Sequence, residues 1–370
     1  MTSTLALGLM SGTSADGVSA ALGKFHGHTF EFVDAVTINY PPETLSKIRR
    51  RGDLSTAAAS LLNRELGEIF SNAALRLLKK THTKPSDVAC IGSHGQTIYH
   101  GPDDALKNTF QLGDPAVIAE RTGIAVVSHF RQRDIAAGGQ GAPLIPFFDH
   151  YFYGNGPVRA LLNVGGIANV TVVGKGIHAP LAFDTGPGNC LMDMAVQEIS
   201  GGKDAFDRGG HLAKQGTIDM AAIQRMIANP FFKKLPPKST GPELFNAAFL
   251  REHLGEKMAS NPADTLATLN YFTCLTIQES FRNHIFSKFS IQEVIVSGGG
   301  AFNKTLMKKL ECLFAPIPVK SIETTGLPAQ AKEPLAFAFF GLRCLQGKIN
   351  HLPSGTGAKH ARVLGSVTRP

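Results

Sequence analysis

The sequence contains no tryptophan and no run of about 18 apolar residues, so we expect no helix that spans a membrane. Its first residues, MTSTLALGLMSGTS, lack a basic stretch and soon break into Gly and Ser, which is not the pattern of a signal peptide. Hydrophobic residues make up 43% of the 370 residues, which excludes intrinsic disorder. Because 39 Gly and 21 Pro are close to ordinary usage, a collagen-like or low-complexity chain is excluded as well.

Motifs of cysteine chemistry are also missing. The five cysteines are an odd number, they lie far apart, and neither a CxxC pair nor a zinc-like histidine set occurs. This pattern indicates unpaired thiols in a reducing compartment. We therefore predict a cytoplasmic protein without a disulfide framework or a zinc site.

The excess of positive over negative charge is small. The chain has 37 Lys and Arg against 29 Asp and Glu, a net charge of +8, and the basic residues form short scattered pairs such as Lys79-Lys80. No basic tract is interleaved with aromatic residues. We expect a solvated surface that attracts anions mildly, which suits an anionic small substrate better than a nucleic acid.

The Walker pattern GxxxxGK[ST] is absent, because every Gly-Lys pair is followed by Phe, Gly, Asp or Ile. The sequence therefore argues against a P-loop kinase.

What is present is a strand–turn–strand pattern that occurs twice. The apolar segment 5–10 runs into the polar turn 11–17 and then into strand 18–25. In the second half, segment 160–164 meets Gly165-Gly166 and is followed by another strand-like segment. Such duplication constrains the whole fold. Further strands are predicted at 30–38, 88–92, 123–127, 170–173, 181–183 and 293–297, and helices at 54–80 (with Asp53 as N-cap), 115–121, 191–199, 218–227, 265–286, 303–313 and 333–345.

The amino-acid composition of the chain changes at 131–146, which is polar, then Gly-rich, then Pro-rich. We predict an N-terminal domain at 1–133 and a C-terminal domain at 134–346, with the tail 347–370 as a candidate to pack back on the first. The predicted fold is α/β, with two duplicated actin-like (ribonuclease H-like) domains and ATP in the cleft between them. The segment 138–141 is expected to absorb changes of backbone angle when that cleft closes.

Three Gly-rich segments predict a nucleotide site. A phosphate needs bare amides with no Cβ in the way, and Gly12, Thr13 and Ser14 would supply amides and hydroxyls. For one such turn alone, a plain hairpin is the alternative. The second turn at Gly165-Gly166 and the segment 297–300, after a buried strand, favour phosphate binding.

Several polar residues are candidates for the chemistry. Asp184 lies where an apolar strand leads into a Gly-Pro-Gly loop, which suits a general base in a cleft, although an N-cap or an Asx-turn is the alternative. His94 and Gln96, within GSHGQT, would bind sugar hydroxyls or would be structural. Arg131 and Asp134 lie at the crossover, where an arginine can receive a carboxylate or support the hinge.

At these residues the chain resembles the anhydro-N-acetylmuramic acid kinase family. The matching stretches run from end to end in family order: LMSGTSADG (9–17), GSHGQT (92–97), the long and specific QLGDPAVIAERTGIAVVSHFRQRDIAAGGQGAPLIP (111–146), NVGGIANVT (163–171), FDTGPGN (183–189), PPKSTGPELFN (236–246) and SGGGAFN (297–303).

The resemblance implies a kinase of the acetate and sugar kinase, chaperone and actin superfamily. Such an enzyme uses ATP and Mg²⁺ to hydrolyse the 1,6-anhydro ring of anhydro-N-acetylmuramic acid and to phosphorylate O6. The product, N-acetylmuramic acid 6-phosphate, returns peptidoglycan sugar to metabolism. The resemblance implies that Asp184 deprotonates the water that attacks C1. It implies small-molecule partners, with no nucleic acid and no membrane, and a homodimer as a candidate assembly.

The site residues follow from the same resemblance. The implied ATP contacts are Ser11, Gly12, Thr13, Ser14, Ala15, Asp16, Gly17, Val18, Ser19, Asn163, Gly165, Gly166, Asn169, Gly186, Gly188, Gly298, Gly299 and Gly300. The implied substrate contacts are His94, Gln96, Asp114, Arg131 and Glu333, and the implied metal-side carboxylate, acting through water, is Asp16.

Two positions depart from the family pattern. Ser19 stands where an acid commonly follows DGV, and Pro334 stands where a small residue is usual after Glu333. Proline suits a first helical turn, so we expect the helix to form. Two alternatives stay open: another actin-like sugar or acid kinase, and a non-metabolic actin-like or chaperone-like ATPase. The block 111–146 favours the anhydrosugar, and the motifs leave no room for a peptide-binding region.

Overall fold

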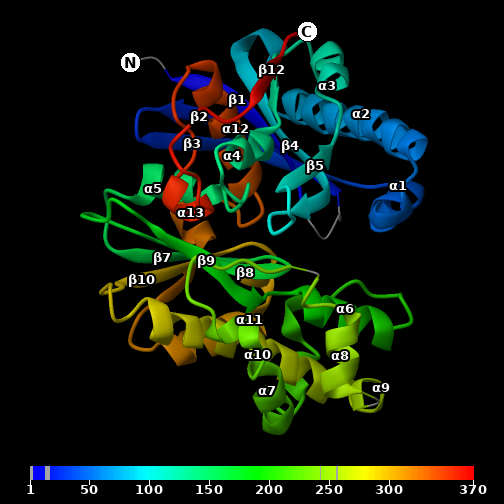
Figure 1. Ribbon diagram of the computed structural model, residues 1–370, viewed down its shortest axis with the longest axis vertical. Helices are drawn as coiled ribbons and strands as arrows, with labels where there is room; N and C mark the ends of the chain where they lie inside the picture. The colour runs from blue at the N-terminus through cyan, green and yellow to red at the C-terminus, as the bar shows by residue number, and fades with distance from the viewer. Residues whose placement is uncertain (1–2, 13–16, 242, 256) are drawn as a thin grey trace. The chain divides into compact units, whose positions relative to one another are not determined.

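The computed structural model describes residues 3–12, 17–241, 243–255 and 257–370 (Figure 1). The chain forms two compact units: the first unit holds 1–152 and 330–370, and the second unit holds 153–329. Each unit contains one β-sheet. No helix within the described ranges is both long enough and apolar enough to cross a membrane.

The first unit contains the elements from the N-terminus to α5 and those at the C-terminal end of the chain. They are β1 (Thr4–Ser11), β2 (Gly17–His26), β3 (Thr29–Asn39), α1 (Pro42–Arg49), α2 (Thr56–Lys80), β4 (Val88–Gly101), β5 (Asn108–Leu112), α3 (Pro115–Thr122), β6 (Val126–Ser128), α4 (Phe130–Ala136), α5 (Ile145–Tyr153, whose last residue belongs to the second unit), α12 (Lys332–Leu345), α13 (Pro353–Thr356) and β12 (Ser366–Thr368).

The second unit contains the remaining elements. They are β7 (Arg159–Val164), β8 (Ile167–Val173), β9 (Leu181–Pro187), α6 (Cys190–Ile199), α7 (Met220–Ile227), α8 (Ala247–Leu254), α9 (Lys257–Ser260), α10 (Pro262–His284), β10 (Glu293–Ser297), α11 (Lys304–Phe314) and β11 (Val319–Ser321).

The two sheets share an arrangement of five strands, to which the first unit adds β5, paired with β4, and β12, paired with β6. In the first unit the order is β12-β6-β4-β1-β2-β3, and in the second it is β11-β10-β7-β8-β9. In both, the first three strands form an antiparallel meander. Two further strands, β4 and β6 in the first unit and β10 and β11 in the second, add in parallel on the other side of the first strand. The predicted α/β class and duplication are therefore confirmed, whereas the predicted cleft between the units stays a prediction.

Side-chain alternation along β1 explains how the first sheet is covered on both faces. Leu7 and Leu9 belong to the same apolar cluster as α2 residues such as Phe70. Gly8 lies between them. A Cβ on this residue would point to the opposite face of the sheet and would collide with the carbonyl oxygen of Pro334. A glycine at this position thus lets α12 lie directly on the strand.

The second unit is built around α10. Apolar residues of β7 and β10, such as Leu162 and Val296, share one cluster with Leu266 and Phe281 of α10 and Leu310 of α11. This cluster fixes the strands whose ends carry the Gly-rich segments.

The compact units divide at 152/153 and 329/330, whereas the sequence analysis placed the boundaries at 133/134 and 346/347. Packing accounts for the first difference. The rings of Phe148 and Phe152 of α5 pack against Phe30 of β3 in tilted and edge-to-face arrangements, with centroid distances of 5.4 and 4.9 Å, so α5 packs on the first sheet. In the tail, β12 pairs antiparallel with β6 of the first unit.

Two local predictions are wrong. The N-cap of α2 is Ser55, whose hydroxyl accepts the Ala58 amide hydrogen at 3.2 Å, because Asp53 ends a separate 3-10 turn. The strand predicted at 88–92 runs on to Gly101, since its later residues pair with β5. GSHGQT therefore lies within a strand and not in a loop.

Candidate functional site

The base of the β1–β2 hairpin carries a buried polar cluster. The Ser11 hydroxyl lies 2.8 Å from the Gly17 carbonyl oxygen and 2.6 Å from Gln96 Oε1. The Tyr40 hydroxyl donates to Ser11 Oγ at 2.9 Å. Gln96 Nε2 donates to the Gly12 carbonyl at 3.3 Å. The cluster therefore fixes both ends of the turn that the sequence assigns to phosphate.

Gln96 contributes its whole side-chain amide to this cluster. Its side chain is fully buried among Ser11, Gly12 and Tyr40. It therefore supports the hairpin, and its predicted contact with a sugar hydroxyl stays a prediction.

The remaining hairpin residues are placed only in part. Thr13, Ser14, Ala15 and Asp16 lie outside the described residues. Val18 is fully buried in the apolar core, so only its main chain could approach a nucleotide. The Ser19 hydroxyl lies 2.9 Å from that of Thr37 on β3.

His94 and Arg131 meet as a pair. Arg131 Nε donates to His94 Nε2 at 2.8 Å, and His94 Nδ1 lies 2.8 Å from the Gly95 carbonyl oxygen. The histidine is thus the neutral Nδ1–H tautomer. Burial, and secondly Arg131, hold the His94 pKa well below its usual value, and burial lowers the pKa of Arg131 to about 10. Arg131 keeps its charge at neutral pH and is the cationic group of this cluster.

Glu333 and Asp114 occupy helix starts. Glu333 lies in the first turn of α12, where burial raises the pKa of its carboxyl while Lys332 and Arg131 oppose the rise. Asp114 is the N-cap of α3, and its Oδ1 accepts the Ala116 amide hydrogen at 2.9 Å. One oxygen of Asp114 is thus committed to the helix. Pro334 is compatible with the first turn of α12, as expected.

In the second unit the Gly-rich segments pack against one another. The amide of Asn189 donates to the Gly165 carbonyl at 2.7 Å, and its side-chain amide donates to Val164 O at 3.1 Å. Asn163 Oδ1 lies 3.3 Å from the Ser297 hydroxyl. A Cβ on Gly298, whose φ is +80°, would lie 2.7 Å from Asn163 Oδ1. Glycine at position 298 is therefore required for the close approach of the segment 297–300 to Asn163 and Val164.

The same unit places the other predicted phosphate glycines around this cluster. The amide of Gly188 donates to the Gly166 carbonyl at 2.9 Å, and Gly186 pairs with Ala168 between β8 and β9. The 3-10 turn Gly299–Phe302 directly follows Gly298. The predicted residues of the second unit are therefore brought together.

Asp184 belongs to this assembly. It lies within β9 opposite Asn169 of β8, beside an irregularity of register between Ala168 and Asn169. The sequence predicted a strand at 181–183 with Asp184 just after it. In the structure, Asp184 lies within the strand, which continues to Pro187. Asp184 is also not the cap of α6, whose N-cap is Asn189.

The carboxylate of Asp184 has few compensating donors. Its Oδ2 accepts the Thr240 amide hydrogen at 2.9 Å. Burial raises the pKa of Asp184 to about 7; the Thr240 hydrogen bond opposes this, Glu243 adds to it and Lys238 lowers it. A carboxyl with a pKa near neutrality can take up and release a proton, as a general base must.

Lys238 is the cation beside this carboxyl. It is buried, with Nζ 4.7 Å from the ring centroid of Phe231 and 5.9 Å from that of Phe183. Burial lowers the pKa of Lys238 to about 8, against the effect of Asp184. Its main-chain carbonyl accepts the Asp184 amide hydrogen at 3.0 Å.

Sequence reasoning assigned no role to Tyr40, Lys238 or Thr240. Lys238 and Thr240 lie in PPKSTGPELFN, so their position in a family stretch was the available signal. Tyr40 lies outside every quoted stretch, and its link to Ser11 depends on the pairing of β2 with β3.

Within the described ranges, no three His, Cys, Asp or Glu residues are grouped to hold a metal ion. Mg²⁺ in nucleotide sites needs only one or two carboxylates, because phosphates and water supply the other oxygens.

Comparisons with known proteins give one consistent result. A family model described as anhydro-N-acetylmuramic acid kinase matches residues 4–370. A protein of Caldanaerobacter subterraneus subsp. tengcongensis is 40% identical, covering 98% of this chain and 96% of the relative. Relatives from Francisella tularensis subsp. novicida and Gloeobacter violaceus are 39% and 41% identical and cover 98% and 99% of this chain, and 97% and 99% of their own lengths. All three carry the name anhydro-N-acetylmuramic acid kinase.

Proposed function

The chain belongs to the anhydro-N-acetylmuramic acid kinase family, and we propose that Asp184 is the general base of its reaction. The enzyme transfers a phosphoryl group from ATP to anhydro-N-acetylmuramic acid, opens the 1,6-anhydro ring and forms N-acetylmuramic acid 6-phosphate in the recycling of cell-wall sugar. The observation that carries the assignment of Asp184 is the raised pKa of its carboxyl, about 7, next to the Gly-rich cluster of the second unit.

In the proposed reaction, Asp184 removes a proton from water as the water oxygen bonds to C1. The bond between C1 and O6 breaks, and O6 bonds to the γ-phosphorus as ADP leaves. Asp184 then returns its proton to solvent. Lys238 supports this cycle, because its charge keeps part of the Asp184 population ionised at neutral pH.

Two groups of residues are proposed to hold ATP. In the first unit they are those of the β1–β2 hairpin, positioned by Gln96 and Tyr40. In the second unit they are the Gly-rich residues around Asn163 and Gly298. Mg²⁺ is proposed to arrive with the nucleotide and to be held by Asp16 through water. When bound, the ion neutralises charge on the phosphates.

The acceptor side is proposed to centre on Arg131. The sugar carries a lactyl carboxylate, and a charged guanidinium held by His94 is a suitable partner for it. His94, Asp114 and Glu333 are proposed as further acceptor contacts. Gln96, although predicted among them, is proposed to act on the ATP side through the hairpin.

The alternatives are disfavoured by the length of the match. Another actin-like sugar or acid kinase, or a chaperone-like ATPase, would not be expected to align over 98% of the chain with relatives of this name.

A cytoplasmic location and a homodimer are proposed from the resemblance. The five cysteines, all free, support the first, and light scattering of the purified protein tests the second.

The experiment that tests the function is a panel of acceptors. The wild-type protein and Asp184→Asn are incubated with ATP, Mg²⁺ and either anhydro-N-acetylmuramic acid, N-acetylmuramic acid, N-acetylglucosamine or glucose. Phosphorylation of the anhydrosugar by the wild-type protein alone is expected. Equal use of the open-ring sugars would contradict the proposal.

A further inference from the structure

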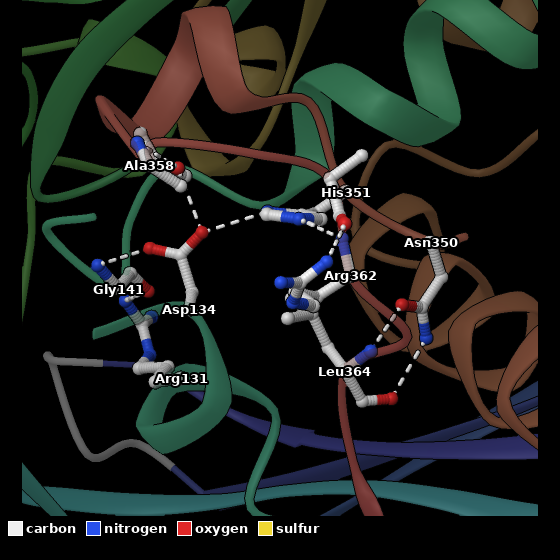
Figure 2. A network of polar contacts seen from close by, with 10 residues as sticks. Arg131, Asp134, Gly141, Asn350, His351, Ala358, Arg362 and Leu364 are labelled. Carbon is white, nitrogen blue, oxygen red and sulfur yellow. Dashed lines mark hydrogen bonds and ion pairs between the residues drawn. The ribbon is translucent and has the colours of Figure 1, made fainter. Parts of the chain in front are cut away.

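The Asp134 carboxylate lies at the centre of a buried network that joins two distant parts of the first unit (Figure 2). Its Oδ1 lies 2.7 Å from His351 Nδ1 and accepts the Thr356 hydroxyl hydrogen at 2.7 Å. Its Oδ2 accepts the Gly141 amide hydrogen, also at 2.7 Å. One carboxylate thus holds the loop after α4 and the C-terminal segment together.

Which of His351 and Asp134 donates the hydrogen in their contact follows from the partner of His351 Nε2. His351 Nε2 accepts the Arg362 amide hydrogen at 2.8 Å, so Nδ1 carries the ring hydrogen and donates to Asp134. The segment is also held by Asn350, whose side chain bonds the Phe340 carbonyl and both main-chain groups of Leu364.

The network extends through Gly141 to Arg131. The Gly141 amide is bound by Asp134, and its carbonyl accepts from Arg131 Nη1 at 3.1 Å. Arg131 Nε is bound by His94, which leaves Nη2 with no hydrogen bond to any residue in the described ranges. The guanidinium is therefore held at two of its three nitrogens, and Nη2 remains to donate to a ligand.

Main-chain bonds tie the same loop to the tail. The Gln140 amide donates to the Thr356 carbonyl at 2.8 Å, and the Lys359 amide donates to the Ala137 carbonyl at 2.9 Å. The segment 138–141, which the sequence suggested as a hinge, is thus anchored within one unit. Loss of a contact here would move Gly141 and, with it, the guanidinium of Arg131.

We propose that Asp134, His351 and Thr356 are positioning residues that aim Arg131 at the anionic group of the acceptor sugar. The proposal rests on the proposed role of Arg131 in acceptor binding. It makes the C-terminal segment 350–364 part of the acceptor site, although none of its residues was predicted to act there.

Steady-state kinetics with both substrates tests this proposal. Thr356→Val removes the hydroxyl and keeps the shape, and His351→Leu removes the ring donor. Each is expected to raise KM for the sugar about 3- to 20-fold, because small misplacements of a binding group are costly. KM for ATP should stay within about twofold, and kcat within about threefold.

Conservative variants and a matched control separate positioning from folding. Thr356→Ser and His351→Asn keep a donor toward Asp134 and should retain a sugar KM near that of the wild-type protein. Thr122→Val removes another buried threonine hydroxyl of the first unit, one that donates to Ile118 O at 2.7 Å, and should leave the sugar KM unchanged. A loss of folded enzyme would lower kcat and not raise KM.

A double variant gives the sharpest comparison. In an Arg131→Ala background, Thr356→Val should add no further rise in sugar KM, because both changes remove the same contact. A sugar KM within twofold of the wild-type value for both Thr356→Val and His351→Leu, while Arg131→Ala raises it, overturns the proposal alone. If the wild-type protein phosphorylates no anhydrosugar, the proposed function fails, and this inference fails with it.

Discussion

Asp184 and Lys238 are joined twice, by main-chain hydrogen bonding at 3.0 Å and by the opposite charges of their side chains. The contact brings the loop 236–240 against β9. It places a buried ammonium group beside a carboxyl whose pKa is raised to about 7. Burial thus raises the pKa of Asp184, and the charge of Lys238 limits that rise.

Asp184→Asn should abolish phosphoryl transfer while ATP still binds. The amide cannot accept a proton, and loss of a general base costs roughly 10²- to 10⁴-fold in rate. Turnover is measured with the anhydrosugar, and ATP binding by calorimetry with a non-hydrolysable analogue. Turnover within threefold of the wild-type value would remove Asp184 from the role of base.

The pH dependence of kcat/KM should show an acid limb near 7. Asp184 must be ionised to accept a proton, so activity should rise as the pH passes through its raised pKa. Lys238→Met removes a charge that lowers this pKa, and the limb should move to higher pH. Lys234→Met, at an exposed neighbour, is the control and should not move it. A limb that stays in place in Lys238→Met would contradict the account of the pair.

Arg131→Ala should weaken sugar binding. A charge-assisted hydrogen bond contributes about 1.5–3 kcal/mol, so KM for the sugar should rise about 10- to 100-fold. Initial rates at varied sugar and fixed saturating ATP give this value, and the reverse experiment gives KM for ATP. If only KM for ATP changes, Arg131 belongs to the nucleotide side.

Gln96→Met should weaken ATP binding and leave sugar binding nearly unchanged. The substitution keeps the length of the side chain but removes the acceptor for Ser11 and the donor to Gly12. KM for ATP should rise about three- to tenfold, since a typical hydrogen bond contributes about 1 kcal/mol. Tyr40→Phe, which removes one donor to Ser11, should act in the same direction and less strongly. A rise confined to KM for the sugar would restore the role that the sequence predicted for Gln96.

The sequence predicted the repeated strand–turn–strand units, because alternation and Gly-rich turns are local signals. It misjudged GSHGQT, since whether a strand continues past Gly92 depends on its pairing with β5. It also placed the cap of α2 on Asp53, where both Asp53 and Ser55 have suitable side chains and the backbone favours the second.

The candidate site was predictable where a motif lies in one stretch and not where it joins distant ones. Asp184 and the Gly-rich turns were predicted as site residues from their local pattern. The hydrogen bond between Asp134 and His351 joins residues far apart in the chain, and no local sequence pattern at either residue predicts the other as its partner. Lys238 faces Asp184 through folding of the second unit, so its effect on the carboxyl pKa needed coordinates.

The central claim is that water attack at C1 and phosphoryl transfer to O6 occur in one reaction that depends on Asp184. The most direct measurement is mass spectrometry of the sugar after a brief reaction with ATP and Mg²⁺ in H₂¹⁸O, quenched before the anomeric oxygen exchanges. The account predicts a product that has gained one phosphate and one ¹⁸O at C1 with the wild-type protein, and unreacted sugar with Asp184→Asn. A phosphorylated sugar that retains the anhydro ring, or full activity of Asp184→Asn, would contradict it.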